Sequence, residues 1–219
     1  MVAFFCPAPH FSVRAPLVLE YLGTQTRNTN GADQTWSGVS LGAADASRRI
    51  LLAITNAGDA NTRTVASTIA GVGGTQIATS GGTAVFSAIH IAHVPTGTTG
   101  DIRLLFSANT VNQMAIGIYR VIGMGADAAY DSAGTFGTSP QSISLDVPSG
   151  GVVIGAARVS TNTTFSWTGA DEGYDLTLSN SVTQTHSGGS RSFVSAVSGH
   201  SVSVSSASSP HLCAVSLSP

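Results

Sequence analysis

The sequence contains no lysine and little charge of either sign. All nine basic residues are arginine, eleven residues are acidic, and charged residues make up 9% of the 219-residue chain, against about 25% in an ordinary globular domain. Binding to nucleic acid or to an anionic membrane surface requires clustered cations. With a net charge of −2, the sequence predicts neither partner.

Cysteines and long apolar runs are also scarce. Cys6 and Cys213 are too few for a disulfide framework, and the sequence leaves open whether they pair. No run approaches the ~18 apolar residues of a membrane-spanning helix, so we expect no membrane insertion. The N-terminal segment lacks a basic region and is interrupted by Pro7 and Pro9, unlike a signal peptide. We therefore expect synthesis in a cytoplasm.

Strand patterns recur along the whole chain. Apolar and polar residues alternate from residue 142 to 147, so Ile143, Leu145 and Val147 should face a core. Residues 152–157 form a continuous apolar run, which is typical of a strand buried on both faces. Gly, Asn and Pro turn signals separate such segments. The sequence predicts an all-β protein of antiparallel β-sandwich, jelly-roll or immunoglobulin-like type, with almost no helix.

The two halves of the chain repeat the same order of strand patterns. Ile50-Leu-Leu-Ala-Ile matches Val152-Val-Ile-Gly-Ala, and the preceding Val39-Ser-Leu matches Ile143-Ser-Leu. Three further matches follow in the same order: Val85-Phe-Ser-Ala with Phe193-Val-Ser-Ala, Ile102-Arg-Leu with Val202-Ser-Val, and Ala115-Ile-Gly-Ile with Ala214-Val-Ser-Leu. We predict two tandem β-sandwich domains, residues 17–123 and 124–219.

Residues 1–16 precede the first strand pattern and are predicted to form an extended N-terminal arm, since their prolines favour an extended chain. Phe4, Phe5 and Phe11 give this arm apolar side chains to bury. They would pack either on their own domain or on a neighbouring molecule. We treat these three residues as a candidate assembly arm.

Signatures of catalysis and cofactor binding are lacking. The sequence has no P-loop, Gly-x-Gly-x-x-Gly or His-Glu-x-x-His motif. His90 and His93 lie in one expected strand, where residues three apart point to opposite faces, so they should not share a metal ion. We expect no enzyme activity, no catalytic residue, no cofactor and no bound metal.

One dense acidic cluster, at residues 171–175, offers a candidate binding site. Asp171, Glu172 and Asp175 could hold Ca²⁺, although the Asp-x-Asp-x-Asp-Gly order of a calcium loop is absent. Trp167 and Tyr174 flank the cluster. Aromatic faces stack on sugar rings and carboxylates accept hydrogen bonds from hydroxyls, so these five residues form a candidate glycan-contact patch. The alternative is a solvated acidic turn, with Trp167 in the core.

Several segments carry a resemblance to a known group of proteins. They are residues 39–54, residues 88–102 with their Val-Pro-Thr-Gly-Thr turn, Ile116-Gly-Ile-Tyr-Arg-Val121, and Asp146-Val-Pro-Ser-Gly-Gly-Val-Val-Ile. In these motifs the chain resembles the small β-rich virion proteins of tailed phages and gene transfer agents from alphaproteobacteria. The resemblance covers residues 17–219. It implies a virion component and transfers no functional residue.

These observations together lead to a functional expectation. We expect a structural virion protein, assembled in the host cytoplasm and attached to the tail as a fibre, spike or tip component, with a role in host-surface contact. The expected partners are other virion proteins, further copies of the chain, with a trimer favoured, and a host surface glycan. A head decoration protein that bridges capsomers and a free carbohydrate-binding module are the alternatives.

Overall fold

The structure, a computed structural model, describes residues 14–58, 64–81, 86–107, 111–180 and 182–219. Within these ranges it consists of antiparallel strands without helix, which confirms the all-β prediction. No helix in the described residues is long and apolar enough to cross a membrane. The first half contains β1 (Val18–Arg27), β2 (Asp33–Ser40), β3 (Arg49–Gly58), β4 (Val65–Ile69), β5 (Val72–Thr79), β6 (Phe86–His93), β7 (Thr99–Phe106) and β8 (Val111–Ile122). The second half contains β9 (Asp131–Phe136), β10 (Gln141–Val147), β11 (Val152–Val159), β12 (Ser166–Thr168), β13 (Asp171–Asn180), β14 (Val182–Ser192), β15 (Val197–Ser205) and β16 (His211–Leu217).

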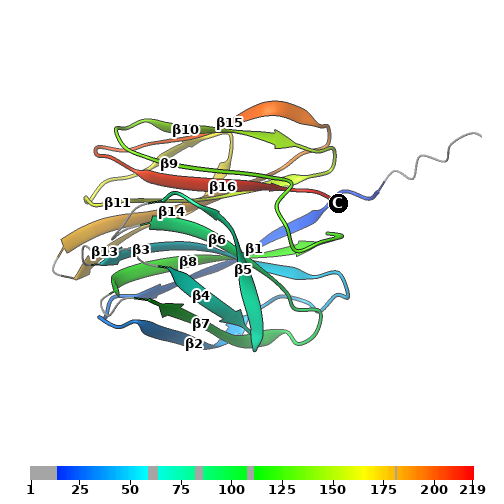
Figure 1. The fold of residues 1–219 in the computed structure, drawn as a ribbon, viewed down its shortest axis with the longest axis horizontal. Coiled ribbons are helices and arrows are strands. Elements are labelled where there is room, and N and C mark those ends of the chain that lie inside the picture. Colours follow the sequence, from blue (N-terminus) through cyan, green and yellow to red (C-terminus); the bar gives the residue numbers. More distant parts are fainter. Residues whose placement is uncertain (1–13, 59–63, 82–85, 108–110, 181) are drawn as a thin grey trace, which may run out of the picture.

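The strands stack in four layers (Figure 1). The first half is one curled eight-stranded sheet in the order β1-β8-β3-β6-β5-β4-β7-β2. Its β1-β8-β3-β6-β5 part lies against a five-stranded sheet, β13-β14-β11-β16-β9, and a three-stranded sheet, β10-β15-β12, covers the far side of that sheet. The strands of residues 17–123 and those of residues 124–219 thus form separate sheets that lie against each other in one stack.

Three apolar cores separate the four layers. The first lies inside the curled sheet and includes Ile50, Leu52 and Ile116. The second joins the two halves, and the third fills the second half. Strands of the two inner layers have a core on each side, so the run at β11 is buried along its whole length, as predicted. The alternation predicted at β10 is likewise confirmed, with its apolar residues facing in.

The curled sheet is nearly closed by contacts between its two edge strands. The indole Nε1 of Trp36 in β2 donates to the carbonyl oxygen of Thr26 in β1 at 3.0 Å. Arg27 donates from its guanidinium to the carbonyl oxygen of Thr35 and lies over the Trp36 ring, 5.1 Å from its centroid. These side-chain bridges replace the backbone ladder that a fully closed sheet would have.

The two halves have the same strand order. Adding eight to each strand number of the first sheet gives β9-β16-β11-β14-β13 followed by β12-β15-β10, which is the order of the second half read from β9. The difference is that the ladder is interrupted between β13 and β12, which splits the second half into two sheets. Packing between the halves follows the same relation: β5 contacts β16 as β13 contacts β8, and β6 contacts β11 as β14 contacts β3. The halves therefore face each other across an approximate twofold axis.

The repeat was predicted in the right order but with the wrong residues aligned. Ile50 faces the core inside the curled sheet, whereas Val152 faces the other half. The counterpart of Ile50 is therefore Val153, which faces the core of the second half. Both strands are apolar on both faces, so their sequences do not reveal a slip of one residue. Phe193, matched with the start of β6, lies beyond the end of β14, the counterpart of β6.

Candidate functional site

The predicted glycan-contact patch is divided between two faces of the five-stranded sheet. The ring of Trp167 lies over Gly155 and Gly189 on the side of the second-half core, and its Nε1 donates to Ser187 Oγ at 2.8 Å. The ring of Tyr174 lies on the opposite side, between the halves. Because the two rings point inward on opposite faces, they cannot form one stacking surface for a sugar, and the prediction of a shared patch is wrong in this respect.

Tyr174 belongs to a cluster of three tyrosines at one seam between the halves. Its ring stacks on Tyr21 of β1 at 6.1 Å between centroids and 13° between planes, and Tyr21 contacts Tyr119 of β8 at 5.2 Å. Tyr119 and Tyr174 are buried, and the Tyr174 hydroxyl donates to the carbonyl oxygen of Ala53 at 3.4 Å. Burial raises the pKa of both phenols. The three tyrosines therefore pack the two halves of the protein against each other.

The three carboxylates of the patch lie at its edge without forming a metal site. Asp171 and Glu172 are exposed, while Asp175 is half-buried and accepts a hydrogen bond from the backbone N–H of Phe165 at 2.9 Å. Burial raises the pKa of Asp175 against the effect of that hydrogen bond, and burial together with the charge of Asp175 raises the pKa of Glu172. No group of three metal-ligating side chains occurs within the described ranges.

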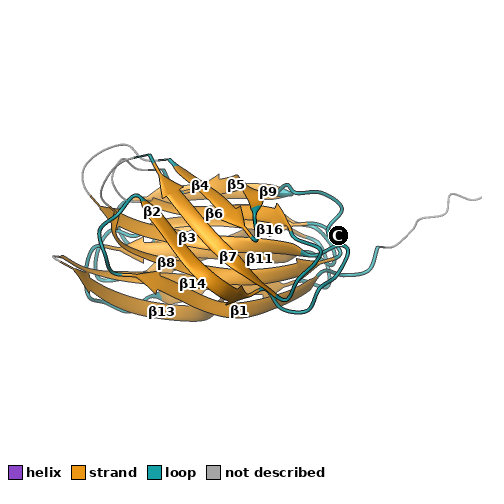
Figure 2. Cartoon of the chain, turned by 90° about the horizontal axis from the view of Figure 1, so that it is seen from below, coloured by secondary structure: helices purple, strands orange, loops and turns teal. Residues whose placement is uncertain are grey.

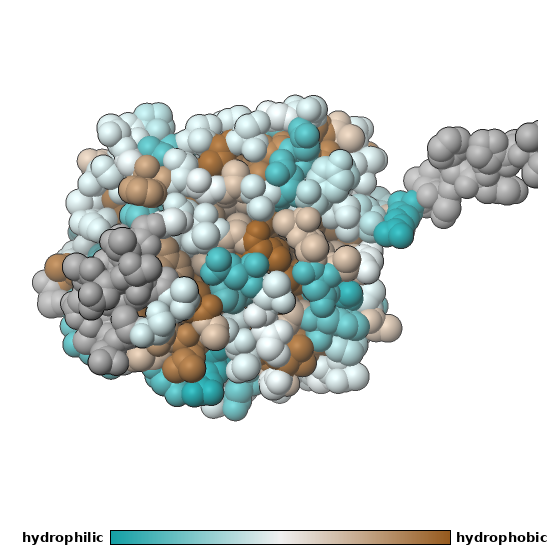
Figure 3. Space-filling model, in the orientation of Figure 1, coloured by the Kyte–Doolittle hydropathy of each residue, from teal (hydrophilic) through white to brown (hydrophobic). Residues whose placement is uncertain are grey.

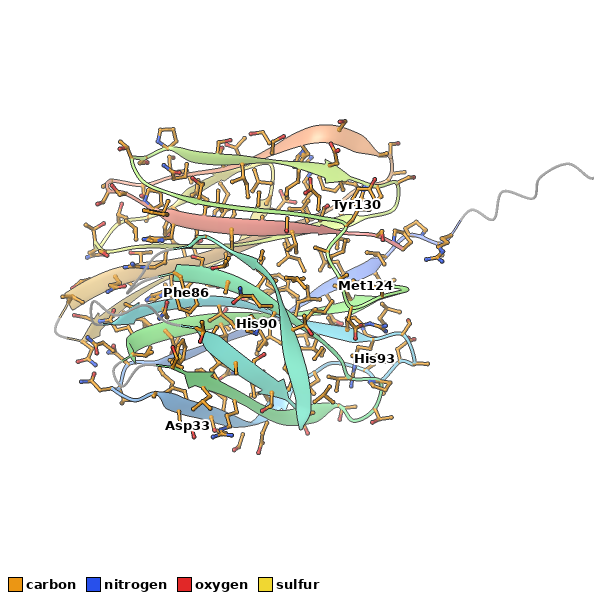
Figure 4. All side chains as sticks on the ribbon, viewed as in Figure 1. Asp33, Phe86, His90, His93, Met124 and Tyr130 are labelled. Atoms are coloured by element: carbon orange, nitrogen blue, oxygen red, sulfur yellow. The ribbon has the colours of Figure 1, made fainter. Side chains whose placement is uncertain are left out.

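His90 and His93 lie apart, as their spacing in one strand predicts (Figure 4). His90 is buried, with Nδ1 2.9 Å from Ser67 Oγ. His93 is half-buried, with Nε2 2.9 Å from the carbonyl oxygen of Ala46. Desolvation lowers the pKa of His90 to about 4, so the ring is neutral near pH 7 and serves as a packed polar side chain.

Two buried arginines are structural. Arg48 is fully buried and donates to five backbone carbonyl oxygens, those of Leu41, Gly42, Val94, Thr96 and Gly97, at 2.6–3.1 Å. It thereby holds the loops at residues 41–42 and 94–97 against the start of β3. Arg158 is also fully buried, and its Nη2 donates to Ser160 Oγ at 2.7 Å and to Gln184.

The expectation that the chain has no Gly-x-Ser-x-Gly motif is wrong, because that spacing occurs at residues 38–42. Catalytic use of this motif requires a strand-turn-helix context with a histidine beside the serine. Here Ser40 ends β2, no helix follows, and its Oγ accepts a 3.5 Å hydrogen bond from the backbone N–H of Gly42. The spacing therefore matches the motif without its structural context.

A surface hollow of about 320 Å³ lies at the opposite seam between the halves. Residues 76–79 of β5 and 132–134 of β9 line it, and Figure 2 shows the two strands next to each other. Phe136, on the same face of β9 as Ser132 and Gly134, is 58% exposed and stacks on His211 at 5.3 Å and 10°. No sequence pattern predicts this site, because Gln, Thr, Ser, Ala and Gly occur throughout the chain.

The candidate assembly arm lies almost entirely outside the described residues, including Phe4, Phe5, Phe11 and Cys6. The described base of the arm is held by two hydrogen bonds. Arg14 Nη1 donates to the carbonyl oxygen of Pro219 at 2.8 Å, and the backbone N–H of Leu17 donates to the carbonyl oxygen of Gly150 at 2.8 Å. Cys213 is buried between the halves as a free thiol, and desolvation raises its pKa.

Comparison with known proteins identifies no family: no protein-family model, no curated protein and no solved structure matches the chain.

Proposed function

We propose that this chain is a non-catalytic structural component of a tailed-phage-like virion, attached to the tail. In this proposal the N-terminal arm docks on neighbouring virion proteins, including further copies of the chain, and the double sandwich is a rigid body that contacts the host surface. The sequence resemblance at residues 39–54 and 116–121 supports the virion assignment.

One structural observation carries the proposal: the base of the arm is anchored at the side of the molecule where strands of both halves end. Arg14 is hydrogen-bonded to Pro219, so the arm begins beside the end of the last strand (Figure 1). The attachment point lies at the side of the stack, level with its two inner layers, so the base of the arm covers neither outer layer. A body held at one side has its other sides free, which suits a tail appendage that must hold to the particle and reach outward.

The surface is consistent with life outside a cell. Most residues on the face in Figure 3 are weakly polar, and the hydrophobic ones form small separate patches. Ion pairs are sparse among the described residues, with three Arg–carboxylate contacts, Arg49–Asp127, Arg103–Asp33 and Arg120–Glu20. A particle with few surface ion pairs depends little on the ionic strength around it.

Mass spectrometry of phage-like particles from the bacterium that carries the gene tests the proposal. We expect the chain as a stoichiometric component that remains with tails when tails and heads are separated. Recovery with heads alone would favour the decoration alternative. Absence from intact particles would contradict the virion proposal and leave a free binding module.

A further inference from the structure

The twofold relation between the halves can be fixed residue by residue. In the β5–β6 ladder the register shifts between Gln76 and Ala78, and in the β13–β14 ladder it shifts between Glu172 and Tyr174. Both shifts leave one residue out of the ladder, which is a β-bulge. Aligning the two bulges makes Ala78 the counterpart of Tyr174.

The strand pairings carry this correspondence across the sheets. Ala78 pairs with Ile89 and Tyr174 with Gly188, so these two partners are equivalent. Through β3, Ile89 is connected by Ala53 to Gly117 of β8. Through β11, Gly188 is connected by Ala156 to Cys213 of β16, so Gly117 and Cys213 are equivalent. Two residues farther along these strands, Tyr119 is equivalent to Val215. Tyr119 pairs with Tyr21 in β1, and Val215 pairs with Ser132 in β9. Each tyrosine of the cluster therefore has a small counterpart: Ala78, Val215 and Ser132.

The two seams between the halves consequently differ in how they are filled. At the β1/β13 seam, the stacked rings of Tyr21 and Tyr174 occupy the space between the sheets. At the β5/β9 seam, Ala78 and Ser132 stand in the equivalent positions, and both line the hollow. Ile89 and Cys213, which replace Gly188 and Gly117, recover volume in the buried interior. At the hollow the rings of Tyr21 and Tyr174 thus have no aromatic counterpart, although Ile77, the counterpart of the bulge residue Gly173, lines the hollow and packs on the core between the halves.

The chemistry of the hollow suits a neutral aromatic group. Its lining contains no charged side chain. The hollow is closed at Gly134, where the backbone of β5 lies so near that a Cβ would meet the Thr79 carbonyl oxygen at 1.9 Å, so the space for a ring lies beside Ala78 and Ser132. Phe136 offers an exposed ring beside it, near Gly81. Aromatic pairs are favourable beyond the area they bury, so an incoming ring would find both space and a partner.

We propose that this hollow receives a phenylalanine side chain from residues 1–13 of a neighbouring copy of the chain. That segment contains Phe4, Phe5 and Phe11 and no Asp, Glu, Lys or Arg, which matches the uncharged hollow. Thirteen extended residues span up to about 45 Å, more than the ~30 Å diameter of a small domain. The inference rests on the proposed role of the arm in assembly and adds the position at which the arm docks.

The test uses the full chain carrying Phe4→Ser, Phe5→Ser and Phe11→Ser, so that its own arms do not compete. A fluorescein-labelled peptide of residues 1–13, with Cys6→Ser, is titrated in and followed by fluorescence anisotropy. We expect saturable binding that weakens at least tenfold when Ser132→Tyr is added, because the new ring fills the hollow. Ser144→Tyr, at an exposed serine of β10, is the matched control and should leave binding unchanged.

A second readout does not depend on any variant of the hollow. The same peptide with a photoreactive benzophenone at position 11 should crosslink to residues 76–79 or 132–136. Crosslinks elsewhere, absence of peptide binding, or equal binding to the Ser132→Tyr chain would each overturn the inference. So would a neutral oligosaccharide that binds in a Ser132-dependent manner while the peptide does not. Failure of the proposed assembly role is recognised separately, since the full chain would then have the native mass of a monomer.

Discussion

Tyr174 of β13 and Ala78 of β5 occupy equivalent positions in the two halves of the chain, each following the bulge of its strand. Tyr174 reaches into the other half, where its hydroxyl meets the carbonyl oxygen of Ala53 and its ring stacks on Tyr21. Ala78 reaches no farther than its own methyl group and leaves a hollow beside it. The two equivalent seams between the halves therefore differ: tyrosine rings fill the β1/β13 seam, and the β5/β9 seam has a hollow.

Truncating Tyr174 should destabilise the protein strongly. Tyr174→Ala removes a buried ring from the junction of the halves, and we expect a loss of about 3–5 kcal/mol in the free energy of unfolding. Tyr130→Ala, at a ring that is 57% exposed, should change it by less than about 1 kcal/mol. Guanidinium denaturation of both variants measures this, and equal effects would contradict the packing role of the tyrosine cluster.

The ring of Tyr174 also explains why residue 188 is a glycine. A Cβ on Gly188 would meet Cε1 of Tyr174 at 2.5 Å, whereas a Cβ on Gly73 would have nothing within 4 Å. Gly188→Ala should therefore cost about 1–3 kcal/mol through overpacking, and Gly73→Ala should stay within about 0.5 kcal/mol of the parent. In the Tyr174→Ala background the penalty for Gly188→Ala should shrink. A fully additive double variant would mean that the two residues do not interact.

Arg48 should matter far more than an exposed arginine. Arg48→Met leaves buried carbonyl oxygens without a donor, and we expect a loss of more than about 3 kcal/mol. Arg103 pairs with Asp33, and both side chains are about half exposed, so Arg103→Met should cost less than about 1 kcal/mol. Thermal and chemical denaturation compare the two, and similar costs would show that the carbonyl cage around Arg48 contributes little.

Stability should fall in mild acid because of buried neutral histidines. Burial lowers the pKa of His90 to about 4, and burial with the nearby Arg158 charge lowers that of His186 to about 3. Between pH 6.5 and these values the unfolded chain binds protons that the folded chain does not, so the free energy of unfolding decreases as pH falls. His186→Gln should reduce this slope by about 1.4 kcal/mol per pH unit. An unchanged slope between pH 6 and 4.5 would contradict the buried neutral state of His186.

The fold class could be predicted from the sequence better than the candidate site could. Alternation at Ile143, Leu145 and Val147 identified β10 correctly because one face of that strand meets solvent. The strands of the inner layers have apolar residues on both faces, so their patterns carried no information about which face meets which core, and Ile50 was aligned with Val152 in place of Val153.

The candidate site escaped prediction for a different reason. Trp167 and Tyr174 are close in sequence, but a sheet runs between their rings, and only the strand pairings reveal it. The hollow at β5 and β9 is defined by what Ala78 and Ser132 lack, which becomes visible only after the repeated halves are aligned by structure. Such a site carries no motif.

The native mass of the full chain, measured by sedimentation velocity, tests the central claim that the N-terminal arm is an assembly device. We predict a trimer or larger assembly of the 22.1 kDa chain and a folded monomer for the chain with Phe4→Ser, Phe5→Ser and Phe11→Ser. A full chain that stays monomeric over the whole concentration range, or an arm variant that assembles as the parent does, would contradict the account.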